Sequence, residues 1–168
     1  MRRAFSLVEL IVVVVIIGIL AAIAIPRFSR GAAGAGDSSV RANLSVLRNA
    51  IELYYYEHGE YPGQKGDGTN GAGTEAAFIA QLTQYTTDEG LVSATKDATY
   101  RFGPYLRTGI PPCPVAPRMG KTGVAMVTTP PVYQAGAADA GWVFNYQTGD
   151  IRVNSNATDV DGVSYDTY

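Results

Sequence analysis

An uninterrupted apolar run near the N-terminus constrains this chain more than any other feature. Residues 10–25 read LIVVVVIIGILAAIAI and contain no polar side chain. From Phe5 to residue 25 the chain has 21 residues, of which only Ser6 and Glu9 interrupt the apolar character. As a helix this segment spans roughly 32 Å, which is enough to cross a bilayer core of about 30 Å. We therefore expect insertion into a membrane, or removal of the segment during export.

A cleaved signal peptide explains part of this pattern. Arg2 and Arg3 supply a positive N-terminus, and residues 22–24 read AIA, as before a signal peptidase cut. Against it, the apolar run continues at full strength up to Pro26. Glu9 also lies within the apolar block, where a carboxylate costs about 2.5–3.5 kcal/mol near a bilayer centre and less near its edge. This position indicates a functional carboxylate, and snorkelling of Glu9 at the membrane edge is the alternative.

The residues around Glu9 form a recognisable pattern. Residues 3–10 read RAFSLVEL, and Pro26 follows the apolar run. This pattern resembles the class III leader of the type IV pilin superfamily, which includes type IV pilins and type II secretion pseudopilins. Precursors in that family carry a short basic leader that ends in glycine, then Phe or Met, and Glu as the fifth mature residue. Phe5 and Glu9 match the first and fifth mature positions, whereas Ala4 stands where the family has glycine.

The resemblance implies a role for each of these residues. A prepilin peptidase would cut between Ala4 and Phe5, and the new amine of Phe5 would be methylated. In the filament, the Glu9 carboxylate would pair with the Phe5 amine of a neighbouring subunit in a dry core. Because an unpaired buried charge is very costly, only a subunit in the correct axial register neutralises both groups. Pro26 falls where the family places a helix-bending proline.

The resemblance also implies location and partners. The precursor is expected in the inner membrane as a single-pass protein with a cytoplasmic N-terminus, and the head is expected in the periplasm or outside the cell. Its partners would be other copies of the chain, minor pseudopilins or pilins, and an inner-membrane assembly platform. The major pseudopilin of a type II secretion system is the nearest match, partly because a C-terminal cysteine pair is absent. An extracellular pilus subunit for adhesion or motility, and a secreted or anchored binding domain that does not polymerise, are the alternatives.

A second helical segment follows a glycine-rich stretch. Residues 31–36 read GAAGAG, and each glycine costs about 1 kcal/mol relative to alanine in a helix. We expect weak helix or a hinge there, with a plain linker as the alternative. Asp37, Ser38 or Ser39 then offers a helix N-cap. The apolar positions that follow recur at steps of three and four and predict an amphipathic helix: Val40, Leu44, Leu47, Ile51 and Tyr55.

These patterns predict an α+β fold, in which a long N-terminal helix, kinked near Pro26, packs its second half against a small antiparallel sheet. We divide the chain into a leader (1–4), a hydrophobic helix with a hinge (5–36) and a globular head (37–168). A short helix is expected over residues 75–85 with Thr74 as its N-cap, and strands over 124–129, 142–146 and 151–154. Trp142 is expected in the core, and one of the three tyrosines at 54–56 is expected to face inward.

Composition argues against most enzyme classes and against nucleic-acid binding. The net charge is −2 without blocks of like charge, whereas phosphate neutralisation needs clustered Lys and Arg. A single cysteine, Cys113, excludes an intrachain disulfide and a zinc site built on cysteines. The single histidine, His58, has no evident Ser or Cys partner in the sequence. We therefore expect a structural protein with no catalytic residues.

The tail of the chain offers a weak candidate for calcium. Residues 154–166 contain several oxygen ligands close together, among them Asp159, Asp161 and Asp166. Calcium takes six to eight hard oxygen ligands on a flexible loop, and major pseudopilins as a family bind calcium in a C-terminal loop. The spacing does not match an EF-hand, so a solvated acidic tail is the alternative.

Overall fold

The computed structural model describes residues 6–168, with the side chains of residues 24–33 outside the description. One helix dominates it: α1 (Leu7–His58) has 52 residues, which corresponds to about 78 Å. Gly59 ends the helix in the left-handed conformation (φ 72°), and its N–H donates to the carbonyl of Tyr55 at 2.8 Å. Glycine adopts this conformation without a steric penalty, which explains the sharp stop before Glu60.

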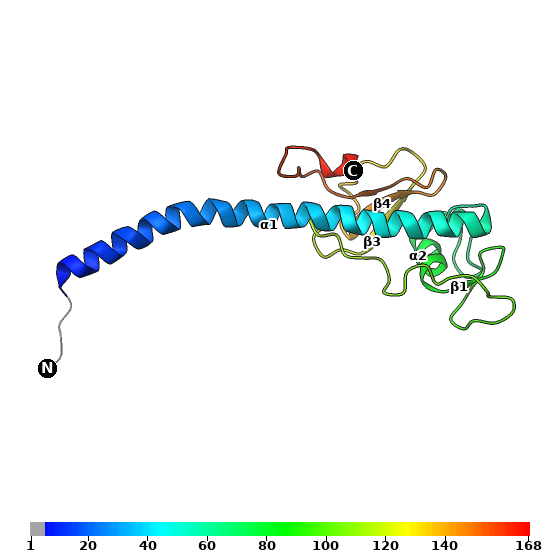
Figure 1. The fold of residues 1–168 in the computed structure, drawn as a ribbon. Coiled ribbons are helices and arrows are strands. Elements are labelled where there is room, and N and C mark those ends of the chain that lie inside the picture. The colour runs from blue at the N-terminus through cyan, green and yellow to red at the C-terminus, as the bar shows by residue number, and fades with distance from the viewer. Residues whose placement is uncertain (1–5) are drawn as a thin grey trace.

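The middle of α1 is helical throughout. The helix passes through Pro26 and the glycine-rich residues 31–36 without a break, which favours the helical interpretation over a linker. The predicted kink at Pro26 falls on residues whose side chains lie outside the description, although Figure 1 shows that α1 as a whole is curved. The predicted N-cap near residue 37 is wrong, because α1 does not restart there. Ser38 and Ser39 instead donate to the helix carbonyls of Gly34 and Ala35.

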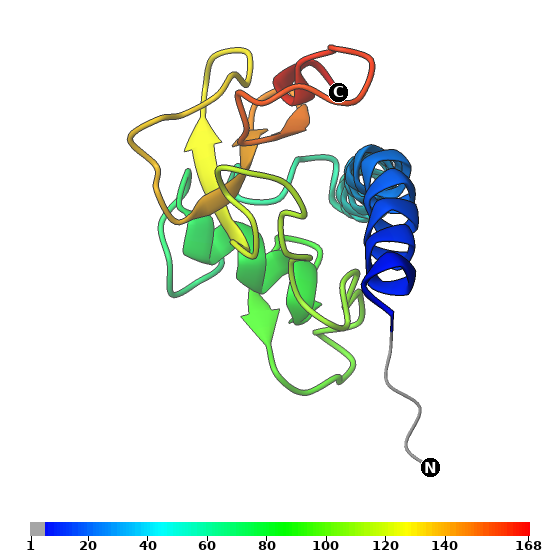
Figure 2. The same ribbon diagram turned by 90° about the vertical axis from the view of Figure 1, so that its left-hand side faces the viewer.

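The head lies against the C-terminal half of α1 only, and the N-terminal half projects away from it (Figure 1). The head contains α2 (Glu75–Thr83), a small ladder of β1 (Tyr85–Thr86) and β2 (Val92–Ser93), and a three-stranded sheet. Thr74 is the N-cap of α2, as predicted, and its hydroxyl accepts from the N–H of Ala77. Viewed along the molecule, α1 lies on one side of the head (Figure 2).

The three-stranded sheet comprises β3 (Gly123–Val127), β4 (Ala140–Asn145) and β5 (Ile151–Val153) in the order β3-β4-β5. β4 and β5 pair antiparallel, as predicted, but β3 and β4 pair parallel, so the sheet is mixed. A parallel pair needs a connection of about a dozen residues to return to the same edge, and residues 128–139 provide it. A short 3₁₀ helix, η1 (Tyr165–Thr167), follows in the tail.

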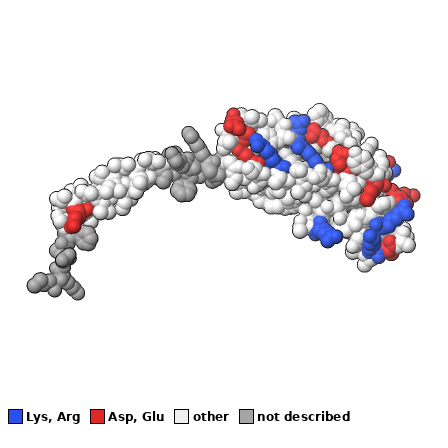
Figure 3. Space-filling view, viewed as in Figure 1, with Lys and Arg blue, Asp and Glu red and all other residues white. Residues whose placement is uncertain are grey.

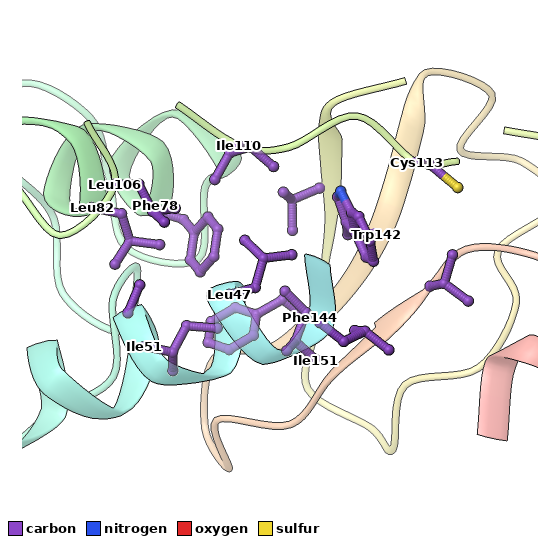
Figure 4. Packing of buried hydrophobic residues seen from close by; sticks show 14 of the residues in the cluster. Leu47, Ile51, Phe78, Leu82, Leu106, Ile110, Cys113, Trp142, Phe144 and Ile151 are labelled. Atoms are coloured by element: carbon purple, nitrogen blue, oxygen red, sulfur yellow. The ribbon is translucent and has the colours of Figure 1, made fainter. Parts of the chain in front are cut away.

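The core forms where α1 meets the sheet and α2. The buried residues on α1 are spaced as the sequence predicts, but Tyr54 (3% exposed) and not Tyr55 (37% exposed) extends the buried face. Phe78 and Phe144 pack with ring centroids 4.6 Å apart, between α2 and β4. Figure 4 shows Leu47 and Ile51 beside the aromatic and aliphatic side chains of β4 and β5. Trp142 is fully buried, as predicted, and its indole N–H donates to the carbonyl of Pro111 at 2.8 Å.

Candidate filament stem and helix terminus

The candidate site is the first part of α1, beginning at its N-terminus. Ser6 is the N-cap, and its hydroxyl accepts a hydrogen bond from the N–H of Val8. The Glu9 carboxylate in turn accepts from the backbone N–H of Ser6 at 3.0 Å, which completes a capping box. Glu9 therefore has a polar partner within its own chain, and its negative charge lies at the positive end of the helix dipole.

Within the described residues, nothing covers the apolar surface of the helix that follows Glu9. The large apolar residues between Leu7 and Ile23 are each 49–73% exposed. In Figure 3 this part of the molecule carries one acidic side chain and is otherwise uncharged, whereas the head carries both signs of charge. Soluble monomers rarely expose contiguous apolar patches beyond a few hundred Å². The stem, defined here as residues 7–23, therefore requires an apolar environment outside its own chain.

A membrane is one such environment. In the part of the chain that the structure describes, no helix is long and apolar enough to cross a membrane.

The predicted processing residues lie at the edge of this site. Ala4 and Phe5 fall outside the described residues, as does the side chain of Pro26. Cleavage between Ala4 and Phe5, methylation of Phe5 and the Phe5–Glu9 pair therefore stay predictions. Glu9 is exposed on the first turn of α1, four residues after Phe5.

The three tail aspartates do not form a metal-binding group. Asp159 is buried, and its Oδ1 accepts from the N–H groups of Asp161 and Val163. Its other oxygen accepts from the Tyr168 hydroxyl. Asp166 accepts from the hydroxyl of Ser164 at 2.6 Å. Within residues 6–168, apart from the undescribed side chains, no three carboxylate, imidazole or thiol groups are placed to hold a metal ion. Calcium binding at the tail stays an untested prediction.

Sequence reasoning missed a polar connection between α1 and the tail. The Asp37 carboxylate is buried, and it accepts from the Tyr165 hydroxyl and from the N–H of Val160. Burial, with the adjacent Asp37 carboxylate, raises the pKa of the Tyr165 hydroxyl, which therefore stays a hydrogen-bond donor at neutral pH. The signal was available, because Asp37 precedes Val40 by three residues on the apolar face of the helix.

Arg41 strengthens the same connection from the surface. Its guanidinium donates to the Tyr168 hydroxyl at 2.9 Å and lies 3.7 Å from the Asp159 carboxylate. The hydrogen bond from Tyr168 is the main cause that lowers the pKa of Asp159 below its ordinary value, and the charge of Arg41 adds to it. The tail is thus held against α1 at the junction between stem and head.

His58 and Cys113, whose residue types are often used in catalysis, both pack within the fold. His58 stacks on Tyr54 at a centroid distance of 4.0 Å, and its ring nitrogens contact the Tyr54 carbonyl and the Thr86 hydroxyl, each at 3.0 Å. Cys113 is buried, and burial raises the pKa of its thiol, which disfavours the reactive thiolate.

Comparison with known proteins finds one family model and several partial relatives. Residues 1–25 match the family described as the prokaryotic N-terminal methylation motif. The type IV major pilin protein PilA of Myxococcus xanthus is 46% identical over 60 residues, which cover 36% of this chain and 27% of PilA. The type IV major fimbrial protein FimA of Dichelobacter nodosus is 42% identical over 88 residues, covering 48% of this chain and 56% of FimA. The type II secretion system core protein G of Escherichia coli is 33% identical over 61 residues, covering 36% and 42% of the two chains.

The matches do not extend over the whole head. The chain spans less than two thirds of the length of the curated relatives it matches. No solved structure gives a significant match. The family model covers residues 1–25, and both pilins and a pseudopilin are among the relatives. The resemblance found in residues 3–26 is confirmed: the chain carries the methylation motif and is similar over part of its length to type IV pilins and to a type II secretion pseudopilin.

Proposed function

We propose that this chain is a structural subunit that polymerises into a type IV pilus-like filament, most like the pseudopilus of a type II secretion system. The observation that carries the proposal is the stem, which is apolar, exposed and without a partner in its own chain. In a filament, stems of neighbouring copies would cover one another, and burial of apolar area would stabilise the polymer by about 25 cal/mol per Å². No step of this function requires catalysis.

The filament needs a second feature that fixes the register of its subunits. Apolar packing alone is tolerant of axial shifts, because one aliphatic surface resembles another. A Glu9 carboxylate that pairs with the Phe5 amine of a neighbour supplies the missing selectivity. Before assembly, the Glu9 carboxylate would keep its hydrogen bond from the Ser6 N–H in the capping box, so the free subunit would carry no unpaired carboxylate at this position. Prepilin peptidase, an inner-membrane assembly platform and minor subunits are the partners that this route requires.

An extracellular pilus for adhesion or motility is the second candidate. The names of the curated relatives favour it, since several are type IV major pilins or fimbrial proteins. The two candidates differ in where the filament ends. Filaments that shear from the cell surface at native expression levels would support the pilus, and filaments found only on overexpression, with secretion lost on deletion, would support the pseudopilus.

Processing provides the first test. Cleavage after Ala4 gives a mature chain that begins at Phe5, and methylation adds about 14 Da to it. Intact-mass and N-terminal sequencing of the membrane-extracted protein would measure both. A mature chain beginning at Ile25 would identify a signal peptide and contradict the proposal.

The Glu9→Ala variant provides the decisive test. It removes a costly charge from the apolar segment, so a simple membrane anchor tolerates it. A filament subunit does not, because the Phe5 amine of each neighbour would lose its partner, at about 3–5 kcal/mol if fully buried. We expect processed, membrane-resident protein with filaments lost or severely reduced, as seen by electron microscopy of the sheared fraction. Abundant normal filaments from the variant as sole copy would exclude Glu9 as the register charge.

A further inference from the structure

The part of α1 that lies in the head carries two charges without an ion-pair partner. Arg48 and Glu52 are both exposed. Arg48 donates through a single nitrogen, Nη2, to the backbone oxygens of Ile151 (3.1 Å) and Tyr168 (2.6 Å), which leaves its other guanidinium nitrogens without a protein acceptor among the described residues. The ion pairs formed among described side chains include neither residue. Both charges are therefore available to a neighbouring molecule.

These two residues repeat a spacing found at the helix N-terminus. Arg48 precedes Glu52 by four residues, as the Phe5 amine precedes Glu9, with the cation first in both pairs. Arg48 lies 43 residues after Phe5, and Glu52 lies 43 residues after Glu9. Twelve turns of an α-helix at about 3.6 residues per turn also contain about 43 residues. Because α1 is one continuous helix between Glu9 and Glu52, these two carboxylate-bearing residues lie on the same side of it.

The repeated spacing has a consequence for assembly, and this step rests on the proposed function. If the Phe5 amine of one subunit pairs with Glu9 of the next, their parallel helices are shifted along the axis by four residues, which is about 6 Å. The same shift brings Arg48 of one subunit level with Glu52 of the next. The axial register that pairs the Phe5 amine with Glu9 therefore also places Arg48 beside Glu52 of the next subunit.

The surface around the two residues is open to a second copy. An open groove of about 370 Å³ runs beside Arg48, lined also by Arg41, Leu44, Ser45, Asn49 and Tyr168. Val46 and Leu53 on α1 are each 50% exposed, which extends the apolar surface of the stem into the head. Figure 3 shows basic and acidic side chains following one another along this part of the molecule.

We propose that Arg48 of one subunit and Glu52 of the next form a second ion pair between consecutive copies of this chain in the filament. The occupant of this surface is a second copy in the four-residue register. Charge complementarity and continuity with the stem surface support this choice. Arg48 keeps its two hydrogen bonds to the head, which hold its guanidinium in place, and the other guanidinium nitrogens face the neighbour's carboxylate.

Charge reversal at Glu52 is the first test, because this side chain makes no hydrogen bond or ion pair within the described residues of its own head. In cells with Glu52→Arg as the sole copy, we expect about a tenfold lower yield of sheared filaments, because like charges then face each other. Glu52→Gln should give a smaller loss. The matched control is Arg107→Glu, a charge reversal at an exposed loop residue outside α1, which should assemble normally. Normal filament yield from Glu52→Arg would overturn the proposal.

Co-expression separates a pair between copies from a pair within one helix, since residues four apart on one helix also meet. Glu52→Arg and Arg48→Glu copies should each assemble poorly alone, because each homopolymer places like charges together. Mixed in one cell, alternating copies restore opposite charges at every contact, so filament yield should return to within about twofold of the parent. A pair within one chain cannot be restored by mixing. Failure of the mixture, with both variants accumulating in protease-resistant form, would overturn the proposal.

This outcome is distinguishable from failure of the proposed function. If the parent chain and Arg107→Glu form no filaments at all, the proposed function fails. If both form filaments and charge reversal at Glu52 has no effect, the proposed function stands and the second ion pair does not exist.

Discussion

The two halves of α1 belong to one helix but have opposite surroundings. In the head, Leu44 and Leu47 are buried against the sheet and α2, and the opposite face of the helix is polar with a few exposed apolar residues. In the stem, the helix after Glu9 is apolar on all sides, and its large apolar side chains are exposed among the described residues. A helix buried on one face completes a domain, whereas a helix that is apolar all round belongs in a membrane or a bundle. The head thus buries an apolar core of its own, whereas the stem leaves its apolar surface exposed.

Removing the stem should have the largest effect, because it eliminates the difference between the two halves of α1. Deletion of residues 1–30 should convert an insoluble, polymerising chain into a soluble monomer, because the exposed apolar surface leaves with the stem while α1 keeps its packing from residue 40 onward. Sedimentation or size-exclusion chromatography of the truncated chain, beside the full chain in detergent, measures the difference. Long filaments formed by the truncated head would contradict the account.

Leucine truncation in each half sharpens the comparison. Leu47→Ala should lower the free energy of unfolding of the head by about 2–5 kcal/mol, since Leu47 is fully buried. Leu10→Ala, in the exposed stem, should change it by less than about 0.5 kcal/mol. Urea titration of the full chain in detergent measures both, and the buried Trp142 provides the only tryptophan fluorescence. Equal losses in the two variants would show that stem and head do not differ as described.

The polar junction between the two halves should depend on pH. The Tyr168 hydrogen bond holds the pKa of Asp159 below its ordinary value in the folded chain. A carboxyl whose pKa is lowered by folding stabilises the fold above its unfolded pKa, about 3.9, and loses that contribution as the pH falls through the folded value. We therefore expect the head to lose stability below about pH 4. Thermal melts across this range would show it, and Asp159→Asn should flatten the dependence; an unchanged profile in the variant would refute this origin.

Calcium should give the smallest effect. Protein donors already occupy both oxygens of Asp159, and Asp166 accepts from Ser164. With no preformed site to bind, calcium should shift the melting temperature of the head by less than about 1 °C relative to a chelator. A clear increase with calcium that Asp161→Ala abolishes would instead establish the tail site anticipated from the sequence.

Much of this fold follows from local patterns in the sequence. The spacing of Val40, Leu44, Leu47 and Ile51 predicts the buried face of α1, and the Thr74 cap predicts the start of α2. Both are local properties, because a helix places residues three and four apart on one face and leaves its first N–H groups unpaired. The apolar run and Glu9, in the N-terminal half of α1, could also be identified from the sequence, because neither depends on tertiary contacts.

The errors concern features that tertiary contacts decide. Tyr54 and Tyr55 are equally apolar neighbours, and packing against His58 and Tyr105 selects Tyr54 for the core. Whether β3 runs parallel or antiparallel to β4 depends on the path of the connection at residues 128–139. Strand propensity does not determine that path. Asp37 reads as a helix cap by residue type, but its partner Tyr165 lies 128 residues away in sequence. Long-range partners of this kind are not visible to local periodicity.

The central claim, that the stem becomes the core of a filament and the head its surface, has one most direct measurement. A cryo-electron microscopy reconstruction of filaments sheared from cells that express the unmodified chain would locate both halves of α1. The account predicts residues 7–23 packed together at the axis, with Glu9 beside the N-terminal amine of a neighbouring copy and the heads outside. Filaments whose axis is built from heads, with the stems on the outer surface, would contradict it.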